Sequence, residues 1–341
     1  MKHCRKPHVL VTGGAGYIGS ILVPLLVKHG YAVTIFDAFF FGKHSIKNFA
    51  KDVRVIQGDV RNPPKDLFDT VDIVIHLAAL SNDPTAEFNP TANKAINTEG
   101  TKVIGCMAKK AGVKRFIFAS SCSIYDCGLH KVTKIKTENA SVKPKNPYSQ
   151  SKFLAEKALL KLSDTTFTPV ILRKGTVYGW SPRMRYDLII NTMVRDALRY
   201  KKLHIFCKGM QWRPLISIQD VAEAYLLAVQ APEKLVKGKI INISSGNYQV
   251  GFIAKEVQRV FKKVFHREIS LIYENDNKVD RSYKVSTKRA EKILHFQSKD
   301  TIEKSIRFLV PYILRHRALQ QFSNPLFYNI EQMKPILQRM S

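Results

Sequence analysis

The chain has few acidic residues, few cysteines and no long apolar stretch. It carries 27 Asp and Glu against 55 Lys and Arg in 341 residues, a formal net charge of +28 at pH 7. Its five cysteines are odd in number and form no CxxC pair, so the sequence predicts neither a disulfide framework nor a metal site. We therefore expect a reducing, cytoplasmic setting. The cysteines are Cys4, Cys106, Cys122, Cys127 and Cys207.

No apolar run approaches the roughly 20 residues that a membrane-spanning helix needs. The N-terminal residues lead straight into an apolar strand, without the separate apolar segment of a signal peptide. No repeat with a period of about 20 to 50 residues is visible, which excludes a solenoid. We expect a globular protein without a membrane span.

The positive charge attracts anions such as nucleotide sugars, NAD, nucleic acid or acidic membranes. Lys and Arg are nevertheless scattered, and the densest stretches, such as RYKK from Arg199, are short. No stripe of basic and aromatic residues indicates a specific nucleic-acid partner. A basic nucleic-acid-binding protein on the same fold stays the alternative from a different functional class.

Residues 9–19 read VLVTGGAGYIG, an apolar strand that breaks into three regularly spaced glycines. The first glycine allows a tight turn, the second lets the backbone approach a pyrophosphate, and the third lets a helix pack closely. We expect that helix over 17–29. This pattern predicts a dinucleotide site with Gly13, Gly16, Tyr17, Ile18 and Gly19.

An acidic residue follows at the distance that a dinucleotide site requires. Asp37 ends a second apolar strand, 32–36, and lies 18 residues after Gly19. A carboxylate there accepts both ribose hydroxyls and repels a 2′-phosphate, which favours NAD over NADP. A third strand, 53–57, leads to Asp59 and Val60, where Asp59 either bonds the adenine edge or forms a turn.

Tyr148 and Lys152 stand four residues apart in a predicted helix over 147–162. Residues at i and i+4 share one helical face, so the phenol and the ammonium point the same way. A lysine cation near a phenol favours the phenolate, and so does the positive ring of an oxidised nicotinamide. Tyr148 is thus a candidate base, although such a spacing alone also occurs by chance.

Small and polar residues follow two further predicted strands, 71–76 and 115–119. Because ligands bind at the carboxyl ends of parallel strands, the serines after the second strand can bond a substrate oxygen, unless they only cap a turn. The turn after the first strand leaves room for a nicotinamide, and Asn97 can tie these strands together from a neighbouring helix. The turn contains Leu77, Ala78 and Ala79.

Taken together, these motifs resemble the extended short-chain dehydrogenase/reductase family, in its NAD-dependent epimerase/dehydratase branch that acts on nucleotide sugars. The resemblance covers roughly residues 8–300. The matching segments are GGAGYIG (13–19), Asp37, GDV (58–60), HLAAL (76–80), Asn97 with GT (100–101), SSCSIY (120–125), YSQSK (148–152), LRKGTVYG (172–179) and RPLISIQDVAEAY (213–225).

The resemblance implies a catalytic triad of Ser121, Tyr148 and Lys152, with Lys152 also holding the nicotinamide ribose. The 4,6-dehydratases of the family carry an Asp-Glu pair directly after the catalytic Ser or Thr. This chain has Cys122 and Ser123 there, so no acid stands ready to protonate a leaving hydroxyl. We therefore do not expect a 4,6-dehydratase.

The resemblance also implies a substrate-binding segment after the sixth strand, with a helix from about Tyr186. Arg183 and Arg185 are expected to contact the phosphates of a nucleoside-diphosphate sugar, unless they are surface residues. The other predicted substrate-binding residues are Thr176, Arg213 and Arg281.

The expected fold class is α/β, a doubly wound parallel Rossmann sheet with a smaller mixed α/β substrate domain at the C-terminal side. We assign 1–175 to the NAD-binding domain, with a return at about 215–245, and 176–320 to the substrate domain. Residues 321–341 are an unassigned tail. By the resemblance, helices over 90–110 and 147–162 form a homodimer interface.

The predicted reaction is hydride transfer to NAD from a ring carbon, C4, of a nucleoside-diphosphate sugar. An epimerase is our first interpretation. A 4-dehydrogenase or a 4-ketoreductase needs the same triad, so both stay open, as does a catalytically silent NAD-dependent regulator. The sequence does not distinguish the nucleotide base or the sugar.

Overall fold

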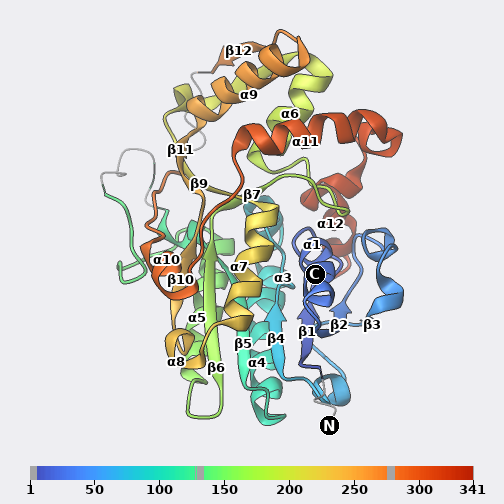
Figure 1. Cartoon of the computed structure of the whole chain (residues 1–341), viewed down its shortest axis with the longest axis vertical. Helices are drawn as coiled ribbons and strands as arrows, with labels where there is room; N and C mark the ends of the chain where they lie inside the picture. The colour runs from blue at the N-terminus through green and yellow to red at the C-terminus, as the bar shows by residue number, and fades with distance from the viewer. Residues whose placement is uncertain (1–5, 127, 129–133, 275–280, 341) are drawn as a thin grey trace.

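The structure is a computed structural model that describes residues 6–126, 128, 134–274 and 281–340 (Figure 1). Its main feature is a seven-stranded sheet in which every neighbouring pair is parallel. In spatial order the strands are β10 (Ile240–Ile243), β6 (Thr168–Lys174), β5 (Arg115–Ser121), β4 (Ile73–His76), β1 (His8–Thr12), β2 (Ala32–Asp37) and β3 (Arg54–Gln57).

The central strands are short, nearly continuous apolar runs because helices cover both faces of the sheet. One face packs against α1 (Gly19–Lys28) and α7 (Ile218–Gln230). The other face packs against α4 (Thr101–Lys110) and α5 (Pro147–Lys161). The predicted fold class, a doubly wound parallel sheet, is confirmed.

The strand order changes direction between β1 and β4, because β2 and β3 lie on one side of β1 and the later strands on the other. Ligands of such sheets bind outside the carboxyl ends of the strands at this point. In Figure 1 the arrowheads, which mark the carboxyl ends of the strands, point toward the smaller part of the molecule at the top. The sheet therefore directs its ligand-binding edge at the space between the two parts.

The predicted helix over 90–110 is three consecutive segments. They are α3 (Pro90–Lys94), the π-helical segment η4 (Ala95–Gly100) and α4. Within the wider turn, the hydroxyl of Thr101 donates to the carbonyl of Asn97 at 2.7 Å. A sequence periodicity alone does not reveal this extra residue per turn.

The smaller part contains a three-stranded sheet and a two-stranded pair, under helices at the top of Figure 1. Its three-stranded sheet mixes a parallel and an antiparallel pairing, and together with its helices it matches the predicted smaller mixed α/β part. The strands are β7 (Thr176–Tyr178), β9 (Trp212–Ser217), β11 (Gly246–Gln249), β8 (Lys202–Ile205) and β12 (Ser270–Tyr273). The helices are α6 (Ile189–Tyr200), α9 (Val250–Phe265) and α11 (Ile302–Arg315). Helix α6 begins three residues later than expected, because the backbone is still extended at Leu188. Tyr186 precedes the helix and is buried against the rings of Phe322 and Phe327.

The C-terminal tail, which the sequence left unassigned, forms helix α12 (Asn329–Gln338). Its Met333 and Leu337 pack into the core on the α4 and α5 side of the main sheet. The predicted domain division stays a prediction, although β10, from the expected return at 215–245, is an edge strand of the main sheet. The remaining α-helices are α2 (Asp83–Phe88), α8 (Glu233–Val236) and α10 (Lys288–Leu294).

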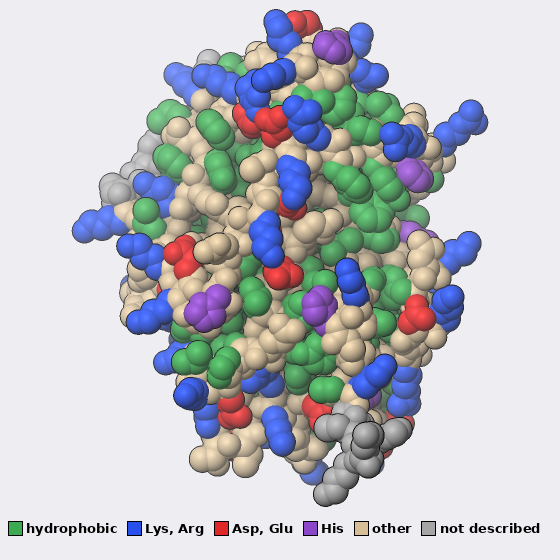
Figure 2. Space-filling view, viewed as in Figure 1, with side chains coloured by type: hydrophobic (Ala, Val, Ile, Leu, Met, Phe, Trp, Pro, Cys, Tyr) green, Lys and Arg blue, Asp and Glu red, His purple; other side chains and the backbone are tan. Residues whose placement is uncertain are grey.

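Over the part of the chain that the structure describes, no helix is long and apolar enough to cross a bilayer. On the face shown in Figure 2, Lys and Arg side chains are spread from top to bottom between neutral and hydrophobic ones. On this face the excess positive charge is therefore not concentrated over one element.

Candidate active site

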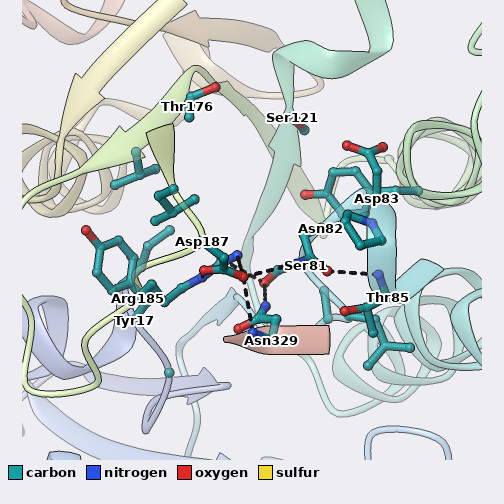
Figure 3. Close-up of a pocket in the computed structure, with 18 of the residues that line it drawn as sticks. Tyr17, Ser81, Asn82, Asp83, Thr85, Ser121, Thr176, Arg185, Asp187 and Asn329 are labelled. Carbon is teal, nitrogen blue, oxygen red and sulfur yellow. Dashed lines mark hydrogen bonds and ion pairs between the residues drawn. The ribbon is translucent and has the colours of Figure 1, made fainter. Parts of the chain in front are cut away.

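A cavity of about 580 Å³ lies at the carboxyl ends of β1, β2, β4 and β5, between the two parts of the molecule (Figure 3). Every predicted site residue except Asn97 lines it. They are Gly13, Gly16, Tyr17, Ile18, Gly19, Asp37, Asp59, Val60, Leu77, Ala78, Ala79, Ser121, Tyr148, Lys152, Thr176, Arg183, Arg185, Arg213 and Arg281.

The glycine turn between β1 and α1 has no room for a side chain at Gly13 or at Gly19. Gly13 has a φ of +74°, and a Cβ atom there would lie 2.6 Å from the backbone nitrogen of Ala78. A Cβ atom on Gly19 would lie 2.5 Å from the carbonyl oxygen of Gly14. The turn therefore offers bare backbone and a helix N-terminus to the cavity, which is the surface that a pyrophosphate requires.

Asp37 is held at the end of β2 by two backbone hydrogen bonds. Its carboxylate accepts the N–H of Ala15 at 2.9 Å and the N–H of Phe39 at 2.7 Å. Burial raises the pKa of Asp37, and these two bonds oppose that change. A fixed carboxylate beside the glycine turn fits the hydroxyls of a dinucleotide ribose, so the residues present suit a bound NAD.

Two predicted cofactor contacts have protein partners. Asp59 forms an ion pair with Arg61 at 2.6 Å, so its role at an adenine edge stays a prediction. Asn97 is buried away from the cavity: it accepts the N–H of Leu80 at 2.8 Å and donates to the Leu80 carbonyl at 3.0 Å. Asn97 therefore fixes the turn after β4 rather than lining the cavity.

The three predicted catalytic side chains meet in the cavity. Helix α5 starts with Asn146, whose side chain accepts the N–H of Ser149 at 2.8 Å, and this start places Tyr148 in the first turn. Tyr148 is 6% exposed and Lys152 is 2% exposed. Tyr148 shares a hydrogen bond with Ser121, which ends β5. The arrangement brings a phenol, a hydroxyl and an amine to one cavity, with the phenol and the amine almost fully buried.

Burial controls the charges of these groups. It raises the pKa of Tyr148, and the carboxylate of Asp83 raises it further, while the Ser121 hydrogen bond and the Arg185 cation lower it. Burial and the nearby Lys174 hold the pKa of Lys152 well below its usual value. The main groups that favour the phenolate are thus Ser121 and Arg185, whereas the sequence indicated Lys152.

A buried network fixes α5 against the sheet. Arg173 on β6 forms an ion pair with Glu156 at 2.6 Å and donates to the hydroxyl of Tyr125 at 2.7 Å. Tyr125 in turn donates to Asn242 on β10 at 2.9 Å. Glu156 lies one turn after Lys152 on the same helix face, so this network also sets the position of the catalytic face.

Opposite this wall lies the segment between β7 and α6. Arg185 forms a two-pronged ion pair with Asp187, at 2.8 and 2.9 Å, and donates to the hydroxyl of Ser81 at 3.2 Å. Asn82 also donates to Asp187, at 3.1 Å. Figure 3 shows these bonds, with Asp83 across the cavity from Tyr17. Arg183 and Arg185 are 2% and 6% exposed, so the surface interpretation of these arginines is wrong.

Arg213 and Arg281 line the catalytic side of the cavity together with Thr176. Arg213 donates to the carbonyls of Trp212, at 2.9 Å, and of Arg281. The guanidinium of Arg281 forms an ion pair with Asp83. Each keeps a guanidinium at the cavity wall, which suits an anionic ligand.

Sequence reasoning missed the acidic and amide partners of these arginines. The turn after β4 leads directly into Ser81 and Asp83. Because ligands bind at the carboxyl ends of parallel strands, these two residues could have been predicted to lie at the site, as the serines after β5 were. Asp187 stands two residues after Arg185 and gave a weak signal. Asn329 gave no sequence signal. Its backbone N–H donates to the side chain of Asp187, which lies 142 residues earlier in the chain.

The described cysteines show no catalytic arrangement. Cys122 is buried and donates to the carbonyl of Arg173 at 3.1 Å, and burial raises the pKa of its thiol. Cys4 and Cys127 lie outside the described residues. Within the described ranges, no group of three or more His, Cys, Asp or Glu side chains is arranged to hold a metal ion.

A family model matches residues 9–244, and its description is the NAD dependent epimerase/dehydratase family. The chain is 32% identical over 247 residues to a putative UDP-glucose 4-epimerase of Methanocaldococcus jannaschii, covering 70% of this chain and 77% of that protein. It is 30% identical over 269 residues to the dTDP-D-glucose 4,6-dehydratase of Homo sapiens, covering 75% and 74% of the two chains.

Solved structures show the same fold. MoeE5, in complex with UDP-glucose and NAD, matches with a TM-score of 0.77 and 26% identity. The match covers 90% of this chain and 99% of that one. The likeness therefore extends over both the main sheet and most of the smaller part.

Proposed function

Because the chain belongs to the NAD dependent epimerase/dehydratase family, we propose that it is an enzyme that epimerises a nucleoside-diphosphate sugar at C4, with Ser121, Tyr148 and Lys152 as its triad. The observation that carries this proposal is that the triad and the glycine turn with Asp37 border one cavity. A 4-dehydrogenase or a 4-ketoreductase needs the same groups and is the alternative.

In this proposal NAD lies along the glycine turn, with its adenosine ribose on Asp37 and its nicotinamide ribose on Lys152. When bound, NAD supplies the hydride acceptor and a positive ring beside Tyr148. Asp37 favours NAD over its 2′-phosphorylated form, because a second negative group there would be repelled.

Tyr148 removes the proton of the sugar hydroxyl at the reacting carbon. Ser121 donates a hydrogen bond to the same oxygen and holds it in line with the phenol. Arg185 and the positive ring together oppose the effect of burial, which otherwise keeps the proton on Tyr148. Tyr148 is almost fully buried, so its hydroxyl has little contact with solvent.

The substrate diphosphate belongs on the catalytic side, near Arg213 and Arg281. The relatives are named a putative UDP-glucose 4-epimerase and a dTDP-D-glucose 4,6-dehydratase, and MoeE5 is seen with UDP-glucose, so pyrimidine nucleotides are the first choice. A 4,6-dehydratase is disfavoured, because Cys122 bonds a backbone carbonyl and Ser123 bonds Ser121. Neither residue supplies the acid that loss of water requires.

The test is to incubate the purified protein with NAD and a panel of UDP-, dTDP-, GDP- and CDP-sugars. Sugar products are separated by chromatography, and NADH is followed by its absorbance. We expect a 4-epimer from a pyrimidine-nucleotide sugar without net NADH. Released NADH would indicate the dehydrogenase alternative, and no turnover with any sugar would contradict the enzyme proposal.

Replacing Tyr148 tests the base itself. We expect Tyr148→Phe to lower kcat by about 100-fold or more, because general base catalysis contributes that much, while NAD still binds. The exposed Tyr273 offers a matched control, since Tyr273→Phe removes the same hydroxyl from a side chain that does not line the cavity. Full activity in the Tyr148 variant would remove Tyr148 from the role.

We further propose a homodimer built on the helices 90–110 and 147–162. Within one chain α4 and α5 already pack together, since Gly105 faces Leu159 and Leu162. Leu154, on the outer side of α5, is 45% exposed and supports a further apolar contact. Light scattering after size exclusion tests this: a monomeric mass would contradict the proposal.

A further inference from the structure

Arg183 is a buried cation without an anionic partner. Its side chain is 2% exposed, and no ion pair joins it to a carboxylate in the described residues. One nitrogen, Nη2, donates to Asn329 at 2.6 Å, and the guanidinium lies 3.7 Å from the centre of the Phe41 ring. The other nitrogen, Nη1, is buried without a hydrogen-bond partner.

The surroundings make this charge costly. Burial and the neighbouring Arg185 lower the pKa of Arg183 to about 9, and Asp187 and Asp37 only partly compensate. Asp187 is already paired with Arg185, and Asp37 accepts two backbone N–H groups. A buried guanidinium in this state is stabilised by an anion with several acceptor oxygens.

The position of Arg183 indicates which anion. Its charge acts on Asp37, Tyr17 and His44, which surround the glycine turn and the end of β2. Arg213 and Arg281 lie instead with Asp83 on the catalytic side. With its adenosine ribose on Asp37, NAD would bring its pyrophosphate close to Arg183. The diphosphate of the sugar nucleotide would lie further away, near Arg213 and Arg281.

We propose that Arg183 binds the pyrophosphate of NAD and that Asn329, from the C-terminal helix, is the residue that positions it. This inference rests on the proposed function, in which NAD fills the glycine-turn end of the cavity. It replaces the expectation from the sequence that Arg183 contacts the substrate diphosphate. A segment that follows the family's matched region by more than 80 residues then helps to build the cofactor site.

Helix α12 has the contacts to do this. Asn329 donates to the hydroxyl of Ser81 at 2.9 Å, and its backbone N–H donates to Asp187 at 3.1 Å. One turn later, Gln332 donates to the carbonyl of Phe40 at 2.9 Å. The helix therefore holds the arginine through Asn329 and, through Gln332, the segment that carries the Phe41 ring beneath it.

The test measures binding by titration calorimetry with four ligands: NAD, ADP-ribose, adenosine and UDP. We expect Arg183→Gln to lower the affinity for NAD and for ADP-ribose by at least about 10-fold, because a hydrogen bond from a charged group is lost. Adenosine and UDP lack the cofactor pyrophosphate and should bind as in the wild type. A lower affinity for UDP with an unchanged affinity for NAD would overturn the proposal. An equal loss of affinity for adenosine would overturn it as well.

Further variants protect this test against misfolding. Arg183→Lys keeps the charge and loses the planar fork, and we expect an intermediate loss of NAD and ADP-ribose affinity. Asn329→Ala should weaken the same two ligands less than Arg183→Gln does. Gln338→Ala, an exposed amide at the end of α12, is the matched control and should change none of the four affinities. Unchanged NAD affinity in Asn329→Ala would overturn the positioning role.

The outcome is separable from that of the proposed function. If the wild type binds NAD and converts no sugar nucleotide, the proposed reaction fails and the assignment of Arg183 is still decided by the four affinities. If the sugar is converted and Arg183→Gln binds NAD as the wild type does, the reaction stands and the assignment fails.

Discussion

The two ends of the cavity are built in different ways. At the cofactor end, the glycines of one short stretch, from Gly13 to Gly19, supply bare backbone, and Asp37 adds one carboxylate held by backbone N–H groups. At the other end, side chains from three distant segments bond to one another: Arg185 bonds to Asp187 and to Ser81, and Arg281 bonds to Asp83. The first end depends on the absence of side chains, and the second depends on paired charges.

This difference sets what a substitution does at each end. A side chain added to the glycine turn meets backbone atoms that cannot move far, so the local shape of the site is lost. A charge removed from the other end leaves its partner buried and unpaired, and that cost falls on the stability of the whole protein. Substitutions at the two ends should therefore separate binding from stability.

The largest effect is expected from Asp187→Asn. Asp187 pairs with Arg185 and also accepts bonds from Asn82 and from the N–H of Asn329. Burial acts to raise the pKa of Asp187, but Arg185, Arg183 and the N–H of Asn329 together hold the pKa below its usual value. Removing one partner of a buried pair costs about 3–5 kcal/mol, which urea unfolding measures.

The matched control is Glu99→Gln, which breaks an exposed pair with Lys102. An exposed pair contributes less than about 1 kcal/mol, so this variant should unfold close to the wild-type midpoint. If the two variants lost similar stability, the second end would not depend on buried charge pairs.

A smaller effect, confined to binding, is expected from Gly13→Ala. The new Cβ would lie 2.6 Å from the nitrogen of Ala78, so the turn has to shift where the pyrophosphate approaches. We expect NAD affinity to fall by about 100-fold, or roughly 2.7 kcal/mol, in a titration. Gly30→Ala is the control: Gly30 also has a positive φ, +84°, but nothing lies within 4 Å of its Cβ position. An equal loss of NAD affinity in both variants would mean that backbone strain, not contact, explains the result.

The same contrast explains how much was predictable from the sequence. Glycine spacing, the helix that starts at Asn146 and Pro147, and the residues that end parallel strands are local patterns, so the fold and the first end were predictable. The π-helical turn at Asn97 has no period that a sequence reveals. The contacts of Arg185 with Ser81 and of Arg281 with Asp83 were not predictable, because they depend on the packing of segments more than 100 residues apart.

The smallest effect links the two ends through the catalytic tyrosine. Asp83 belongs to the charge-paired end, and its carboxylate raises the pKa of Tyr148. Tyr148 acts as a base only without its proton, so the rate rises with pH as the phenol ionises. Asp83→Asn removes one negative neighbour, and the rising limb of kcat/KM should move to lower pH by up to about one unit.

The control for this shift lies on the same short helix. Glu87 is an exposed carboxylate on α2, and Glu87→Gln should leave the rising limb in place. A purely structural role for Asp83 would lower the rate at every pH without moving the limb. A shift to lower pH in Asp83→Asn alone would therefore show that the charge-paired end sets the ionisation of the base, whereas an unmoved limb would confine Asp83 to holding Arg281 in place.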